Sequence, residues 1–172
     1  AAGVDITASG GNVDLNNTVA QIDLSGTTDT NTISASGSVE LANVVDTGTT
    51  TATSPVELVV TAGTGVTLGT VTLSNTLDVD FDTATGTSTL NAGSLSAGTI
   101  EVDGVGTNDV MNFGSTVVST VAGVTIGNAG TVDLDGDVTG ATTVTISDVG
   151  TEIDLAAGVD ITASGGNVDL NN

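Results

Sequence analysis

The chain has 172 residues, enough for a single domain, and carries 21 Asp and Glu but no Lys, Arg or His, which gives a formal net charge of -21. Without cationic side chains the protein cannot form salt bridges between side chains or neutralise the phosphates of a nucleic acid. It also lacks the basic patch that attaches proteins to anionic membrane surfaces. We therefore expect no nucleic-acid partner and no direct membrane contact.

The remaining composition indicates an all-β protein without catalytic activity. Apolar residues make up 38% of the chain, and strand formers such as Val, Ile and Thr alternate with turn formers such as Gly and Asn. No stretch has a helical period, so we expect almost no helix. Cys, Tyr and Trp are absent together with the basic residues. Carboxylates alone can cleave glycosidic bonds, but this chain offers no cation or aromatic platform to hold a sugar. We predict that it is not an enzyme.

One long segment occurs twice. Residues 1–17, AAGVDITASGGNVDLNN, return unchanged as residues 156–172, an offset of 155. We interpret residues 1–155 as one repeat unit and residues 156–172 as the start of the next identical unit. Tandem units of this kind usually form solenoids in which each unit covers its open face with its neighbour. Neither end of the sequence has the character of a cap, so we expect each end to be covered by another copy.

Short strands are predicted along the whole chain, in order. Each is a word of the form apolar–x–apolar, with Gly, Ser, Thr, Asn and Asp between successive words. Stacking one word per coil predicts a parallel β-solenoid of about eight coils per unit, rising about 38 Å at about 4.8 Å per coil. Words at Val132 and Ile153 offer an equally good phase in the second half. The words chosen as coil starts begin at Val4, Ile22, Val39, Val56, Leu77, Ile100, Val124, Val144 and Val159.

Acidic residues are the strongest candidates for a binding site. The middle residues of the stacked words are predicted to form one outward row, in which like charges repel. Ca2+ is the cation that suits such hard oxygen ligands, so we expect that it is the cofactor if one is bound; the alternative is a solvated acidic face screened by salt. A second acidic group surrounds Gly136. The candidate metal ligands are Asp5, Asp23, Glu40, Glu57, Asp78 and Glu101 in the row, and Asp133, Asp135 and Asp137 around Gly136.

Threonine offers another interpretation. Alternating Thr residues are a feature of solenoid ice-binding proteins, to which two segments of this chain bear a thin resemblance. Thr is also simply a good solvated strand residue. The two alternating sets are Thr47, Thr49, Thr51 and Thr53, and Thr83, Thr85, Thr87 and Thr89.

The words GNVDL, GVDITASGG and GTVDLDGDV resemble the strand repeats of secreted bacterial β-strand-repeat surface proteins of the filamentous-haemagglutinin-like type. The resemblance extends over the whole chain and is one of style. It implies a rod-like parallel β-helix displayed at the cell surface. The absence of trypsin cleavage sites is in keeping with an extracellular location.

The function expected from these features is structural. We expect a repeat unit of an extracellular fibre, stalk or sheath that stacks on copies of itself into a stiff, protease-resistant rod. The alternative is a calcium-bridged adhesin or binding module, with ice binding as a further candidate. Halophilic adaptation of an ordinary domain is a third explanation of the charge, and it predicts unfolding at low salt.

Overall fold

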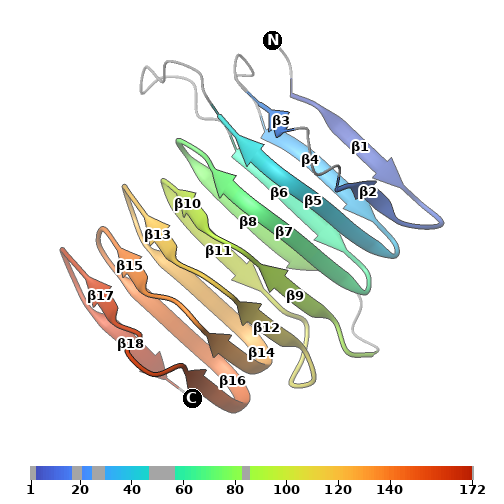
Figure 1. The fold of residues 1–172 in the computed structure, drawn as a ribbon. Helices are drawn as coiled ribbons and strands as arrows, with labels where there is room; N and C mark the ends of the chain where they lie inside the picture. Colours follow the sequence, from blue (N-terminus) through green and yellow to red (C-terminus); the bar gives the residue numbers. More distant parts are fainter. Residues whose placement is uncertain (1–2, 17–20, 25–29, 47–56, 83–85, 172) are drawn as a thin grey trace.

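The computed structural model of the chain describes residues 3–16, 21–24, 30–46, 57–82 and 86–171. Within these ranges it contains strands and no helix, and all the strand pairings are parallel. The strands coil around one axis, with β1 and β18 at opposite ends of an elongated β-solenoid (Figure 1). The predicted fold class is therefore confirmed. No described segment forms a helix with the length and apolar character needed to cross a membrane.

Each coil contributes strands to three faces, which we call face 1, face 2 and face 3. Face 1 consists of β1 (Asp5–Ala8), β4 (Thr30–Ala35), β6 (Glu57–Ala62), β8 (Thr76–Phe81), β11 (Thr99–Asp103), the first parts of β14 (Val124–Leu134) and β16 (Val144–Leu155), and β18 (Val168–Asn171). Face 2 consists of β2 (Val13–Leu15), the first parts of β5 (Ser38–Val45) and β7 (Gly65–Thr72), β9 (Thr89–Ala92), β12 (Val110–Phe113) and the last parts of β14 and β16.

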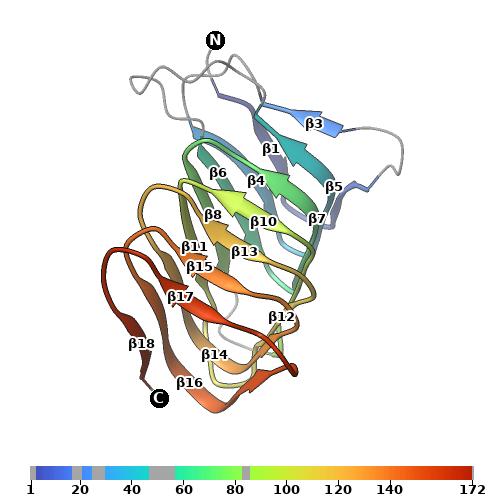
Figure 2. The same cartoon turned by 60° about the vertical axis from the view of Figure 1, so that its left-hand side comes forward.

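Face 3 is seen in Figure 2, where its strands lie side by side from one end of the molecule to the other. It consists of β3 (Gln21–Asp23), the last parts of β5 and β7, β10 (Leu95–Ala97), β13 (Val117–Ser119), β15 (Val138–Gly140) and β17 (Ile161–Ala163).

The corners between faces depend on small residues and on residues that accept positive φ. A Cβ atom at Gly69, where β7 turns from face 2 to face 3, would collide with the carbonyl oxygen of Ala42 in the preceding coil. At the corner between faces 1 and 2, Asn128 and Asp148 have φ angles of 53° and 54°. Asn and Asp are the non-glycine residues that best tolerate this left-handed conformation. These corners allow single long strands, β14 and β16, to continue around the solenoid.

The core is built from stacks of apolar side chains that point inward from successive coils. From Ile33 to Ile146 the members of one face 1 stack are at most 3% exposed, whereas Leu170 at its C-terminal end is 44% exposed. Burying a side chain of this size stabilises a fold by about 1.5–3 kcal/mol. Phe81 and Phe113 are also buried. The stack runs Ile6, Ile33, Val60, Val79, Val102, Ile126, Ile146 and Leu170.

The predicted number of coils was wrong. On face 1, β1 leads to β16 in six steps, and β17 lies two faces beyond the face 1 part of β16. The 155-residue offset therefore covers about six and two-thirds coils instead of eight, and its rise is about 32 Å instead of about 38 Å.

The error lies in the first half of the chain and at the last step. Ile6 pairs with Ile33 and not with a residue 17 or 18 positions on, because that spacing spans two of the three faces and not a whole coil. In the second half, the predicted stacking of Leu77, Ile100, Val124 and Val144 is confirmed. The alternative phase, with words at Val132 and Ile153, is also correct there. These two residues pair with each other, and their words form face 2 of the same coils.

Candidate functional site

Four outward carboxylates form a two-by-two grid on face 1. Asp78 of β8 pairs in register with Glu101 of β11, and two residues further along Asp80 pairs with Asp103. Their apolar neighbours in the strands, such as Val79, are buried, so the alternation of the strand directs the acids outward. With Thr125 the four acids line a hollow of about 380 Å³. We call this arrangement the acidic grid.

The acidic grid carries a repulsion that no cation in the chain relieves. Partial burial, followed by the negative charges of Asp80, Glu101, Glu57 and Asp103, raises the pKa of Asp78 from 3.8 to about 6. Burial and then the charge of Asp103 also raise the pKa of Asp80. Both effects disfavour the charged form of a carboxyl group. Asp78 and Asp80 therefore take up protons more readily than isolated surface acids do.

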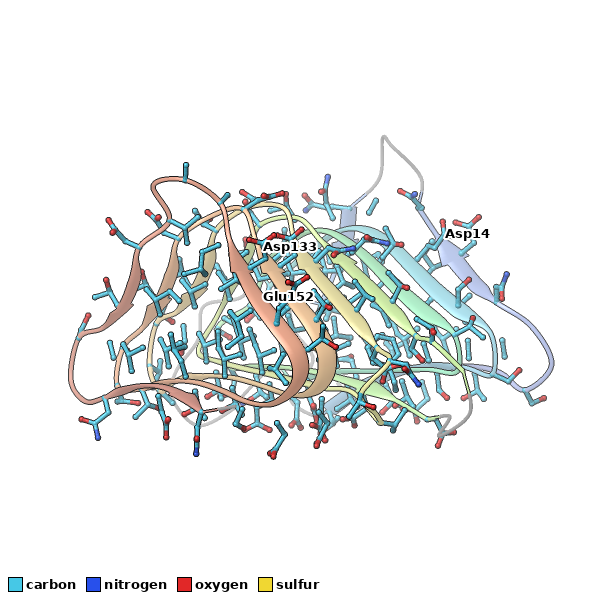
Figure 3. The ribbon with its side chains drawn as sticks, turned by 90° about the horizontal axis from the view of Figure 1, so that it is seen from below. Asp14, Asp133 and Glu152 are labelled. Atoms are coloured by element: carbon cyan, nitrogen blue, oxygen red, sulfur yellow. The ribbon has the colours of Figure 1, made fainter. Side chains whose placement is uncertain are left out.

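A second acidic row follows face 2, with amides in its middle. Asn112 Nδ2 donates a hydrogen bond of 3.0 Å to Asn91 Oδ1, so the central rungs are neutral. Asp14 lies at the N-terminal end of this row, far from Asp133 and Glu152 near the other end (Figure 3). Burial, followed by Asp135 and Asp154, raises the pKa of Asp133. The row runs Asp14, Glu40, Thr67, Asn91, Asn112, Asp133 and Asp154.

The predicted single row of six acids was wrong, because their words lie on different faces. Asp23 is on face 3, beside Val45, and Glu40 is on face 2. The other four are on face 1, but Asp5 pairs with Thr32 and Glu57 pairs with Thr30. Of the six, only Asp78 and Glu101 are register partners.

Sequence reasoning missed Asp80 and Asp103, which complete the acidic grid. Each stands two residues after a predicted acid, in the words Leu77–Asp80 and Glu101–Asp103. That spacing places both acids of a word on the same side of a strand, and it was the available signal.

The acids around Gly136 do not form a common site. Asp133 belongs to the row on face 2, whereas Asp137 Oδ1 accepts a hydrogen bond of 3.0 Å from the backbone N–H of Asp160. Throughout the described ranges, no group of three or more acidic side chains has an arrangement that could hold a metal ion. The calcium expectation stays a prediction: the acidic grid gathers four acids, but it would need further ligands from outside the chain to hold a cation.

The threonine prediction falls mainly outside the described residues, which include neither the set from Thr47 to Thr53 nor Thr83 and Thr85. Thr89 is described, and its register partners are Gly65 and Val110. No threonine ladder continues from this position into the neighbouring coils.

Asp109 is an acid whose role is internal. It is 1% exposed, and its carboxylate accepts hydrogen bonds from the backbone N–H groups of Ser88 (2.8 Å), Val105 (2.9 Å) and Gly106 (3.2 Å). These bonds satisfy the buried charge and tie the loop after β11 to the strand region before β9. Asp109 is therefore a structural residue.

The C-terminal end of the solenoid exposes apolar side chains on two faces. Val168 and Leu170 of β18 on face 1 are 41% and 44% exposed, and Leu155 at the end of β16 on face 2 is 44% exposed. In the described part of the chain, β18 is the one strand of its coil, and it pairs with β16 of the preceding coil alone. This surface, together with the unpaired edges of β17 and β18, we call the open end.

The comparisons with known proteins found no relative. No protein-family model matches the chain, no curated protein matches it, and no solved structure matches it. The fold defines the protein as a parallel β-solenoid, and its function has to be argued from the acidic grid and the open end.

Proposed function

We propose that this protein is a structural repeat unit of an extracellular fibre, stalk or sheath, and that its units stack end to end into a stiff rod. The observation that carries the proposal is the return of residues 1–17 as residues 156–172 in a solenoid whose last strands have an open edge. A strand edge is a template for further pairing. A copy of the unit extends the ladder without any new kind of contact.

The ladders on the three faces support a mechanical role. Parallel hydrogen bonds connect every coil to the next, and the apolar stacks inside are almost fully buried. Each coil contacts only its neighbours, so stability accumulates along the rod as units are added. The same arrangement resists bending, because bending strains a continuous ladder on at least one face.

The charge of the surface suits a rod that works among other rods. A net charge of -21 keeps neighbouring rods apart unless cations bridge them. The absence of Lys and Arg removes every site for trypsin-like proteases. These features, and the resemblance to secreted surface repeats, support the extracellular location.

The test compares chains of one, two and three units, made as tandem copies with the 155-residue offset. The expected result is a rod that lengthens by about 32 Å per unit at constant width, seen by electron microscopy and small-angle scattering. Separate globules joined by flexible links would lengthen irregularly, and that result would exclude a continuous rod.

A second candidate function, a calcium-bridged adhesin or binding module, is favoured by the acidic grid. Its four carboxylates have no counter-charge in the chain, but they are not arranged as a metal site by themselves. Ca2+ at the grid would therefore take further ligands from a second rod or from an acidic ligand, and so join the two. The test is calorimetric titration with CaCl2 of the native chain and of the variant Asp78→Asn/Glu101→Gln. Heat of binding that the variant lacks, and aggregation reversed by EDTA, support this candidate. The absence of binding to the native chain excludes it.

A further inference from the structure

The two copies of the repeated segment occupy different faces of the solenoid. In the first copy Ile6 pairs with Ile33 on face 1, whereas its counterpart Ile161 pairs with Val138 on face 3. The strand that follows shows the same displacement: β2 is on face 2 and its counterpart β18 is on face 1. The 155-residue unit thus ends two faces into a coil.

We propose that successive units are related by a turn of one face, about a third of a revolution, and that the open end is the docking surface for the strands β4 and β5 of the following unit. The docking of β4 and β5 on the open end rests on the proposed stacking of units. The turn between units does not, because the pairing of β17 with β15 already defines the turn within one chain.

The first copy identifies the occupant of the open end. There, β4 and β5 of the next coil pair with β1 and β2, and Val13 is only 7% exposed. Val168 has the same sequence neighbours but lacks these strands, and it is 41% exposed. Residues that follow the second copy in a tandem array repeat the sequence of β4 and β5, so they fit its edge in the register already observed.

Polar groups at the first copy fit the same occupant. Ser38 N–H donates to Asn12 Oδ1 (2.9 Å), and the buried Asn31 accepts at Oδ1 from the N–H of Val4 (3.0 Å). Asn31 Nδ2 also donates to the carbonyl of Glu57 (3.1 Å), so this amide connects three coils. The second copy carries Asn167 as the counterpart of Asn12, and its side-chain oxygen is placed to accept from the Ser38 N–H of a following unit. The N–H of Val159, the counterpart of Val4, donates instead to the carbonyl of Ala156 (3.2 Å) in the single unit.

The turn determines how the charge is distributed along the rod. Each acidic grid lies about a third of a revolution from the previous one, and the faces return to their first orientation after three units, about 96 Å. The grids therefore wind around the rod in a helix, and no side of the rod collects all of them. A partner or a cation bridge meets a grid on any side.

Disulfide trapping tests the turn in a single unit. The chain has no cysteine, and register partners in adjacent strands are about 4.8 Å apart, within the Cα range of a disulfide. The variant Thr139→Cys/Thr162→Cys should form its bond on mild oxidation, because these residues are partners on face 3. The variant Ser147→Cys/Thr162→Cys should not form a bond. Ser147 would be the partner of Thr162 only if the unit contained a whole number of coils, which would return the second copy to face 1. Thr7→Cys/Ser34→Cys is the positive control.

The docking step is tested in a two-unit chain with two cysteine pairs. The first pair is Thr139→Cys/Thr162→Cys, and the second joins Asp169→Cys to Glu40→Cys of the following unit, by analogy with Asp14 and Glu40. Proteolysis at acidic residues and mass spectrometry identify the bonds. Both bonds in one molecule support the proposal.

The two possible failures are distinguishable. If the Thr139–Thr162 bond forms but the bond from position 169 to position 40 of the following unit does not, the turn stands and end-to-end stacking is wrong. If Ser147–Thr162 forms in place of Thr139–Thr162, the one-face turn is wrong and stacking remains.

Discussion

Residues 3–16 and residues 158–171 have one sequence in two settings, and the structure treats them differently. Both segments form two short strands separated by a Gly-rich turn. The first pair of strands lies on faces 1 and 2 in a coil with strands on all three faces, and Val13 is 7% exposed. The second pair lies on faces 3 and 1, and Val168 is 41% exposed. Local sequence therefore specifies strand and turn, whereas the neighbouring coil specifies face and burial.

The largest expected difference is between the interior and the open end of one apolar stack. Ile126→Ala should destabilise the protein by about 2–5 kcal/mol, because it leaves a cavity under a residue that is 0% exposed. Leu170→Ala, in the same stack but 44% exposed, should cost well under about 1 kcal/mol. Urea denaturation of both variants measures the difference. Equal losses would mean that β18 is covered in solution and would break the comparison.

The same contrast can be made with identical residues. Val13→Ala should cost about 1–2 kcal/mol, since two buried methyl groups are lost, and Val168→Ala distinctly less. In a two-unit chain the cost of Val168→Ala should rise to that of Val13→Ala, because the following unit covers it. Denaturation midpoints of both variants, each made in the one-unit and in the two-unit chain, test this. An unchanged cost for Val168→Ala in the two-unit chain would show that the following unit does not cover Val168.

The comparison also explains what could be predicted from the sequence. Alternation of Val, Ile and Leu with polar residues predicts inward and outward positions correctly, as the burial of Leu77 and Val79 shows. It does not identify a face, because a word such as Val4–Ile6 fits any face of the solenoid. The stacking from Leu77 to Val144 was correct because there the words recur once per coil.

The candidate site depended on the same information. Asp78 and Glu101 were predicted together because the register of their strands was predicted correctly. Asp23 and Glu40 were misplaced because the spacing of 17 or 18 residues in the first half spans two faces. Within a solenoid, a row of side chains is a property of the register, and the register depends on loops whose length the alternation does not restrict.

A smaller effect distinguishes interior and terminal acids through pH. The pKa of Asp78 in the folded state is about 6, against an ordinary value of 3.8. The folded protein therefore binds more protons than the unfolded chain between about pH 4 and 6, and its stability rises as the pH falls through this window. After allowance for solvent screening of a half-buried group, the gain is about 1 kcal/mol.

Thermal denaturation between pH 4 and 7 measures this gain. The variant Asp78→Asn should flatten the pH dependence and stabilise the protein at pH 7. The matched control is Asp169→Asn, since Asp169 lies at the open end and pairs with Thr145 instead of another acid. Native stability that falls steadily from pH 7 to pH 4 would contradict the repulsion within the acidic grid.

The smallest expected effect concerns a single hydrogen bond that is present at the first copy of the repeated segment and is expected at the second copy only when another unit follows. Asn12→Ala removes the acceptor of the Ser38 N–H and should cost about 0.5–1 kcal/mol, because the bond is exposed to water. Asn167→Ala should cost nothing measurable in one unit, where the described chain places no following strand beside Asn167. In a two-unit chain it should cost as much as Asn12→Ala, and Asn167→Asp, which keeps an acceptor oxygen, should restore part of the loss.

Amide hydrogen exchange at Ser38 of each unit measures this hydrogen bond directly. Faster exchange at the second Ser38 on Asn167→Ala, with the first unchanged, places this bond at the joint, whereas no change at either Ser38 would show that the second copy does not repeat the contacts of the first.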